Sequence, residues 1–308
     1  MLLKIVYIII GFSFLILGAN LLVKGASNIA KKFNVSEMLI GLTIVALGTS
    51  LPELIVTITS ANKGAGELIL GNAIGSNICN LLLVLGLTAL IKPIKIQKQV
   101  KNIHIPVLLV VTIFVLLMGR STGIGLANGI ILLILFVLYF LYSIIDGIKN
   151  VQVSIAYPYK KSRIFLSILS ILIGIILLKY GGDLVVDNSI NIAELFNISK
   201  EFIGLTIIGL GTSFPELVTS IVAGIKGEQE LAVGNIIGSC IFNLLLILGA
   251  GAVIIPLKVS TGIYKNLKIL ICITILIFLF GLKGRKNHIT RIKGGILLVI
   301  FCLYSFLL

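Results

Sequence analysis

Two copies of one polar motif interrupt a chain that is otherwise strongly apolar. The first copy reads LGTSLPEL at residues 47–54, and the second reads LGTSFPEL at residues 210–217. Each copy places two hydroxyl groups, a proline and a glutamate within a few residues. A carboxylate in apolar surroundings is costly unless a partner neutralises it, so Glu53 and Glu216 are the residues at which chemistry is expected.

The proline of each copy predicts a broken helix. Pro52 and Pro215 lack an amide hydrogen and clash with the preceding turn, so each should end one half-helix and begin another. The first half-helix then ends on free carbonyl oxygens near Ala46 and Gly209, which are suitable ligands for hard cations. Hydroxyl oxygens within one turn of each glutamate add to this set: Thr49, Ser50, Thr212 and Ser213.

The apolar segment after each motif carries a second polar pattern, GNAIGSNICN at 71–80 and GNIIGSCIFN at 234–243. Its polar residues recur every four positions and therefore share one helical face. The glycines spaced by four permit close helix packing. The residues of the polar face are Asn72, Ser76 and Asn80 in the first copy and Asn235, Ser239 and Asn243 in the second.

These side chains predict a cation site made of oxygen atoms alone. Such a site suits Ca²⁺, Mg²⁺, Mn²⁺ or Na⁺ and disfavours Zn²⁺ and Cu²⁺. The two carboxylates balance one Ca²⁺ or two Na⁺, which favours exchange of one ion for the other. We expect no lysine or arginine at the depth of the glutamates, so their partner is a proton or a transported cation.

Composition places these groups in a membrane protein. The 308 residues are 58% hydrophobic and 12% charged, with a mean hydropathy of +1.19. This is too apolar for a soluble chain of this length. Segments of about 20 apolar residues predict ten transmembrane helices, near 4–23, 36–61, 67–91, 103–119, 123–146, 164–182, 199–225, 229–256, 265–282 and 292–308.

An internal repeat organises the ten predicted spans. With an offset of 163 residues, positions 41–94 and 204–257 align without a gap and share 31 of 54 residues. We therefore expect an all-α membrane protein of two five-helix repeats, 1–147 and 163–308, joined by a linker at 148–162. Because five spans is an odd number, the repeats are inverted, with their broken helices meeting at the midplane. Ser36 and Ser199 are the expected N-caps of the second span in each half.

The net charge of +14 is explained by membrane orientation rather than by nucleic-acid binding. With the N-terminus outside, 17 of the 25 Lys and Arg residues lie on the cytoplasmic side, as the positive-inside rule requires. We therefore expect a multi-pass protein of the cell (plasma) membrane with its N-terminus outside. Its predicted partners are Na⁺, Ca²⁺ and the lipid bilayer, with no nucleic acid and no obligatory protein partner.

The doubled G-T-S-x-P-E motif, each copy followed by G-N-x-x-G-S-x-x-x-N, resembles the two repeats of the sodium/calcium exchanger family of cation/calcium antiporters. The resemblance implies ten helices, alternating access, and sliding of spans one and six against the other eight. It also implies a ligand set in which Asn243 stands where some relatives have aspartate, so we expect two charged ligands and no K⁺ transport. The implied ligands are Ala46, Thr49, Ser50, Glu53, Ser76, Asn80, Gly209, Thr212, Ser213, Glu216, Ser239 and Asn243.

The favoured hypothesis is a secondary active antiporter that exchanges Na⁺ for Ca²⁺ without a cofactor. An H⁺-coupled exchanger of Ca²⁺ or another divalent cation is the alternative, since a glutamate can titrate in each cycle. A channel is disfavoured by the inverted repeat and the single midplane site. An enzyme is disfavoured because His104 and His288 lie at span edges, away from any nucleophile at membrane depth.

Overall fold

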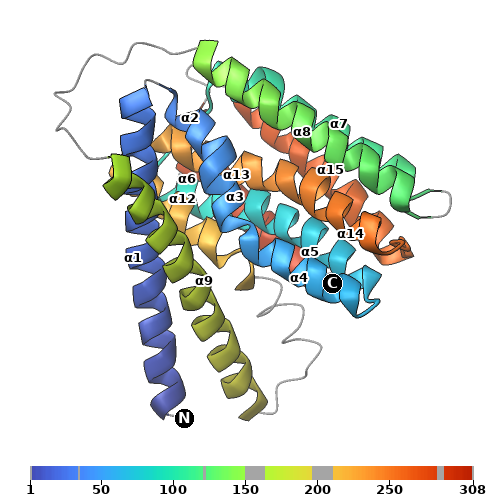
Figure 1. Cartoon of the computed structure of the whole chain (residues 1–308), viewed down its shortest axis with the longest axis horizontal. Coiled ribbons are helices and arrows are strands. Elements are labelled where there is room, and N and C mark those ends of the chain that lie inside the picture. Colours follow the sequence, from blue (N-terminus) through green and yellow to red (C-terminus); the bar gives the residue numbers. More distant parts are fainter. Residues whose placement is uncertain are drawn as a thin grey trace.

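The computed structural model describes residues 2–33, 35–120, 123–149, 164–195, 211–282 and 288–306 as a bundle of helices (Figure 1). The first half contains α1 Leu2–Phe33, α2 Glu37–Ile40, η1 Gly41–Val45, α3 Ala46–Thr49, α4 Leu51–Asn62, α5 Gly66–Cys79, η2 Asn80–Val84, α6 Leu85–Ile91, β1 Ile94–Lys95, η3 Val100–His104, α7 Ile105–Met118 and α8 Leu126–Lys149. The second half contains α9 Ile164–Leu195, α12 Phe214–Lys226, α13 Gln229–Phe242, η5 Asn243–Ile247, α14 Leu248–Ile254, α15 Thr261–Leu282, β2 His288–Ile289 and α16 Arg291–Phe306.

Most of the predicted spans are present as long apolar helices. Within the described residues, seven helices are long and apolar enough to cross a membrane, and the bent pair α2–α3 with α4 makes an eighth. The seventh predicted span, 199–225, is described only from residue 211, and α16 has 16 residues. The multi-pass architecture is therefore confirmed, whereas the count of ten stays a prediction.

The two most enclosed spans form the centre of the bundle. In α5–η2–α6, 72% of the most apolar stretch is buried, and in α13–η5–α14 the share is 83%, against 22–39% in the other single-helix spans. These two helices carry the polar faces predicted from the sequence. Asn80 and Asn243 each begin a π-helical turn, an element common at functional sites, which the sequence did not indicate.

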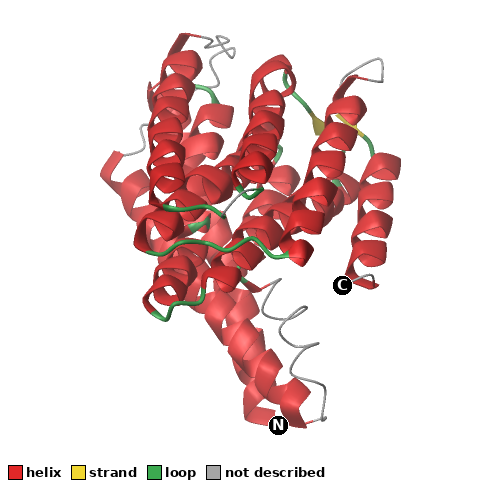
Figure 2. Ribbon diagram, turned by 90° about the vertical axis from the view of Figure 1, so that its right-hand side faces the viewer, coloured by secondary structure: helices red, strands yellow, loops and turns green. Residues whose placement is uncertain are grey.

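Helices α1 and α9 form an antiparallel pair at the side of the bundle, and they extend beyond it at the N-terminal end of α1 (Figures 1 and 2). Glycines bring their backbones together. A Cβ atom on Gly18 would lie 2.8 Å from the Gly174 carbonyl oxygen, and one on Gly174 would lie 2.8 Å from that of Gly18. Gly11 and Gly181 approach each other in the same way. The pair is therefore packed as one unit.

A polar cluster, which we call the Ser27 cluster, joins α1 to the central helices. The Ser27 hydroxyl lies 3.0 Å from a carboxyl oxygen of both Glu37 and Glu228. The Lys31 ammonium lies 3.7 Å from Glu37 and 3.4 Å from Glu228. Burial favours the neutral acid at Glu228, but the hydrogen bond to Glu37 and the Lys31 charge hold the Glu228 pKa below its usual value.

The expected all-helical architecture is confirmed, and short β pairings connect loops at both ends of the bundle. Strand β1 pairs antiparallel with β2, joining the loop after α6 to the loop before α16. A single bridge joins Ile124 to Leu257, between the loop before α8 and the loop after α14. Both pairings connect the two halves of the chain, which hydropathy alone does not predict.

Candidate cation-binding site

The predicted helix break is present in the first half, at Ser50. This residue leaves the helical conformation (ψ 8°), and the helices before and after it are bent by 43°. Pro52 is the second residue of α4, where its missing amide hydrogen is tolerated. Ser213 has a similar conformation (ψ 2°) before α12, in which Pro215 is again second. The N-cap prediction for Ser36 is also confirmed, since its hydroxyl accepts the Leu39 amide at 3.1 Å.

The breaks place both glutamates in the first turn of a half-helix. Glu53 and Glu216 are each 0% exposed. A helix N-terminus favours negative charge, so this position stabilises an ionised carboxylate. One oxygen of Glu216 accepts the Ser50 hydroxyl at 3.1 Å and the Ser239 hydroxyl at 3.4 Å. The other oxygen of Glu216 and both oxygens of Glu53 have no hydrogen-bond donor among the described residues.

The hydroxyl of Ser50 belongs to the first repeat and Glu216 to the second, so the site is built across the repeats. The threonines make the same connection. Thr49 donates to the Asn235 side-chain oxygen at 3.0 Å, and Thr212 donates to that of Asn72 at 3.4 Å. Asn72 and Asn235 were placed on the polar face by their spacing but were left out of the predicted ligand set. Their hydrogen bonds hold each threonine of the motif against the opposite repeat.

Asn77 is a site residue that the sequence analysis missed. Its amide nitrogen donates to the Cys240 carbonyl at 3.0 Å, which fixes its own oxygen toward Asn243. That oxygen accepts the Asn243 amide at 3.1 Å, and the Asn243 oxygen is left without a partner among the described residues. The orientation of Asn243 thus depends on Asn77. The only sequence signal was that Asn77 breaks the repeat, because Cys240 occupies the equivalent position.

The remaining predicted ligands differ in their hydrogen-bond partners. Ser76 lies 3.5 Å from the Thr212 hydroxyl, at the contact between the repeats. The polar atoms of Asn80 and Ser213 are buried with no partner among the described residues. The Ala46 carbonyl accepts the Ser50 amide at 3.0 Å and the Thr49 hydroxyl at 3.3 Å, so the prediction that it is free of hydrogen bonds is wrong. Gly209 lies outside the described residues.

The donor set therefore consists of carboxylate, hydroxyl and amide oxygens. Among the described residues no group of three or more His, Cys, Asp or Glu side chains is placed to hold a metal. Cys79 and Cys240 are buried as free thiols, and Asn77 accepts a long contact of 3.9 Å from the Cys240 sulfur through its carbonyl. Three carboxylate oxygens lack a donor among the described residues, and oxygen atoms of this kind are the ligands that hard cations prefer.

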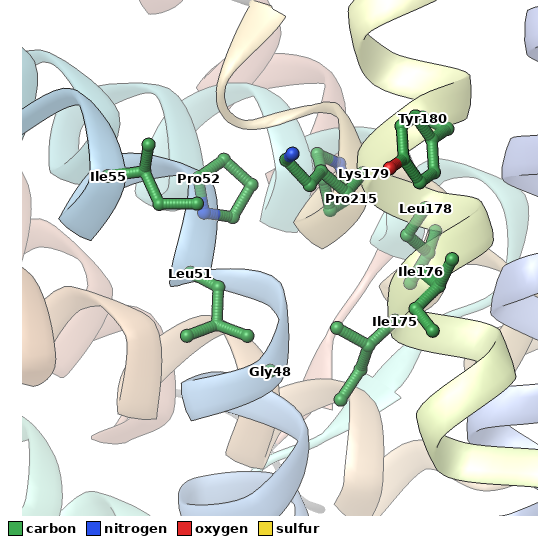
Figure 3. Close-up of a pocket in the computed structure, with 10 residues that line it drawn as sticks. All are labelled: Gly48, Leu51, Pro52, Ile55, Ile175, Ile176, Leu178, Lys179, Tyr180 and Pro215. Atoms are coloured by element: carbon green, nitrogen blue, oxygen red, sulfur yellow. The ribbon is translucent and has the colours of Figure 1, made fainter. Parts of the chain in front are cut away.

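A cavity of about 250 Å³ lies beside the two helix breaks (Figure 3). It separates α9 from α4 and from the start of α12, and its wall includes Pro52 and Pro215. Lys179 of α9 also lines it. The expectation that no lysine lies near the depth of the glutamates is therefore wrong, because the sequence placed Lys179 at the outer end of its span.

The comparisons with known proteins agree with this geometry. The family described as sodium/calcium exchanger protein matches the chain at residues 3–145 and 166–308. The putative antiporter CaxA of Alkalimonas amylolytica is 37% identical over 319 residues, covering 100% of this chain and 99% of the relative. The sodium/calcium exchanger MaX1 of Methanosarcina acetivorans is 30% identical, covering 96% and 95%. Both names denote transporters rather than enzymes.

Solved structures show the same fold. The sodium-calcium exchanger NCX_Mj, soaked with 2.5 mM Na⁺ and 0.1 mM Ca²⁺, superimposes with a TM-score of 0.85 at 33% sequence identity, covering 98% of this chain and 97% of that chain. The inner membrane protein YrbG of Escherichia coli is a further relative, 34% identical over 86% of this chain and 84% of its own length. Because these matches extend over both halves, the chain belongs to the sodium/calcium exchanger protein family.

Proposed function

We propose that the protein is a secondary active antiporter that exchanges Na⁺ for Ca²⁺ by alternating access. The observation that carries the proposal is the pair of fully buried glutamates, with three carboxylate oxygens that have no donor among the described residues. Such oxygens are stable in a membrane only when a cation or proton neutralises them. The names of MaX1 and NCX_Mj, both sodium–calcium exchangers, support these two ions as substrates.

Exchange follows from the charge of the site. Two carboxylates attract either one Ca²⁺ or two Na⁺, and the empty site leaves two buried charges unpaired. Occupancy by one ion type repels the other, because both need the same oxygens. The protein can therefore change between its two open conformations when the site is occupied. When the site is empty, the same change requires two unpaired carboxylates to be desolvated, which is energetically costly. No cofactor takes part, since Na⁺ and Ca²⁺ are the transported substrates.

Alternating access is supported by a difference between the two halves. Position 175 of α9 corresponds to Phe12 of α1 under the 163-residue offset, and Leu51 corresponds to Phe214. On the α1 side these positions are filled by the rings of Phe12 and Phe214, whose centroids lie 6.4 Å apart in an edge-on contact. On the α9 side the equivalent place is the 250 Å³ cavity. The place beside α1 is thus filled by aromatic rings, whereas the equivalent place beside α9 is a cavity that reaches the prolines before the two glutamates.

A cross-link between α1 and α12 should stop transport. In a protein whose four native cysteines are replaced by alanine, Phe12→Cys and Phe214→Cys are joined with a short bifunctional thiol reagent. We expect exchange to fall to background, because α1 can no longer move away from α12, and to recover on reduction. Each single cysteine variant treated in the same way is the control. Full exchange by the cross-linked protein would contradict the movement of α1.

The orientation follows from the basic loops. The loops after α6, after α12 and before α16 lie at one end of the bundle, since β1 pairs with β2 and the Lys95 amide donates to Gln229. These loops carry much of the positive charge, so this end is assigned to the cytoplasm and the N-terminus to the outside. Two single-cysteine variants in a protein without native cysteines test the assignment. An impermeant thiol reagent applied to intact cells should label Lys63→Cys and should not label Lys95→Cys.

Radioactive Ca²⁺ uptake into Na⁺-loaded proteoliposomes tests the function. Dilution into Na⁺-free medium should drive uptake, whereas K⁺-loaded vesicles should show none. Uptake driven by a pH gradient alone would replace the proposal with an H⁺-coupled exchanger. Uptake with no counter-ion gradient would instead indicate a channel.

A further inference from the structure

Lys179 is a charged residue inside a membrane-spanning helix. It lies on α9 within the apolar stretch Ile164–Asn188. Its ammonium lies 5.1 Å from the centre of the Tyr180 ring, and no carboxylate of the described residues is within ion-pair distance of it. The nearest acid along α9 is Asp183, one turn away. A charge at this depth is costly, and in membrane proteins it is kept where it lies in a functional pathway.

The cavity explains where this charge is directed. Figure 3 shows the Lys179 side chain extending from α9 toward the two prolines. Pro52 and Pro215 each immediately precede a buried glutamate. The cavity also reaches Gly48 and Ile55, which lie before and after the first break. The glutamates do not themselves line the cavity, so a cation that approaches them from it passes the ammonium group and then the prolines.

The second half of the molecule provides an internal comparison. The position of α1 that corresponds to Lys179 is Ile16, which is 52% exposed. The equivalent region beside α1 is closed by Phe12 and Phe214 and has no charged residue at this position. The ammonium is thus present on one of the two pseudo-symmetric routes only, so packing of the repeat does not require it.

We propose, on the basis of the exchange function above, that Lys179 is a specificity-determining residue of the α9-side access route. Its ammonium raises the energy of a cation in the cavity, and it does so twice as strongly for a divalent as for a monovalent ion. The route therefore disfavours Ca²⁺ relative to Na⁺ on the face of the membrane to which the cavity opens. The cavity lies between α9 and the two helix breaks, so Lys179 acts on ions only in the conformation that contains this cavity.

Coulomb's law makes the proposal quantitative. The interaction energy is proportional to the ion's charge, so removal of the ammonium should change the apparent KM for Ca²⁺ by the square of the factor for Na⁺. For Lys179→Met, which keeps the length of the side chain, we expect about a threefold decrease for Na⁺ and about a tenfold decrease for Ca²⁺ on one face only. Because a charge in a membrane helix is costly, we expect Lys179→Met to fold as the wild type does.

The test measures both KM values separately at each face in oriented proteoliposomes. Lys179→Arg should match the wild type, and Lys63→Met, which removes an exposed lysine at the end of α4, is the matched control and should also be unchanged. Ile16→Lys should raise both values, with the same squared relation, on the opposite face. Equal factors for the two ions, an equal effect at both faces, or no change in Lys179→Met would overturn the proposal. Absence of Na⁺-driven Ca²⁺ uptake in the wild type would instead refute the exchange function.

Discussion

Replacement of either Glu53 or Glu216 by glutamine is expected to abolish exchange. Each variant removes one of the two charges of the site, and an amide presents only one oxygen where the carboxylate presents two. Each glutamate and the bound cation form a buried ion pair in the proposed site. Removing one partner of such a pair costs about 3 kcal/mol or more, which corresponds to at least about a 100-fold loss of ion affinity. Ca²⁺ flux into Na⁺-loaded proteoliposomes and equilibrium binding of radioactive Ca²⁺ measure the two losses.

The same variants should fold normally. Glu53 has no hydrogen-bond partner for its carboxyl oxygens among the described residues, so a neutral amide there is no harder to bury. Size-exclusion profiles and melting temperatures in detergent should match those of the wild type. Glu67→Gln is the control, because this exposed glutamate in the first turn of α5 lies away from the site and should leave flux unchanged. Flux at the wild-type level in both Glu53→Gln and Glu216→Gln would remove them from the site.

The second large effect is expected from Gly234→Ala. A Cβ atom at Gly234 would lie 2.6 Å from the Met38 carbonyl oxygen and 2.9 Å from the Leu42 nitrogen, both backbone atoms. Alanine favours a helix by about 1 kcal/mol over glycine, so any loss must come from packing. Overpacking at a well-packed contact costs about 1–3 kcal/mol, and a backbone neighbour cannot turn aside. We expect a lower melting temperature and less folded protein in the membrane.

Gly295→Ala is the matched control for this substitution. Gly295 also lies within a helix, and its Cβ atom would have no neighbour within 4 Å among the described residues. Alanine there should therefore be neutral or slightly stabilising. A Gly234→Ala protein as stable as the wild type would show that α13 and the α2–η1 segment can separate, and the close crossing seen here would then not be needed for folding.

Part of the site followed from the sequence because the motif is repeated. Two copies of the same acid, proline and hydroxyls could be explained only by a shared place in a two-fold arrangement, and the bond from Ser50 to Glu216 joins the copies as expected. The helix break at Ser50, two residues before Pro52, and the N-cap at Ser36 also followed, since both depend on local backbone chemistry. These features depend on neighbours close in the sequence or on the repeat itself.

Other features depend on tertiary contacts that no local pattern records. Asn77 orients Asn243 only because the Cys240 carbonyl lies across the helix crossing. The π-helical turns at Asn80 and Asn243 cover five residues each, too few for apolar periodicity to distinguish them from an α-helix. The depth of Lys179 depends on how far α9 is displaced along its axis relative to the two breaks, which hydropathy does not measure.

The Ser27 cluster makes the two ends of the molecule unequal. A chain with two identical inverted halves would have an outward-open and an inward-open state of the same free energy. Under the 163-residue offset, Ser27 corresponds to Ile190 and Glu228 to Ala65, so the equivalent positions carry neither this hydroxyl nor this carboxyl. Movement of α1 away from Glu37 and Glu228 would break the hydrogen bonds of the Ser27 hydroxyl, which isoleucine and alanine side chains cannot form. If the proposed alternating access holds, these bonds stabilise the conformation in which α1 lies against Glu37 and Glu228, so the two open states need not be equally populated before any ion gradient is applied.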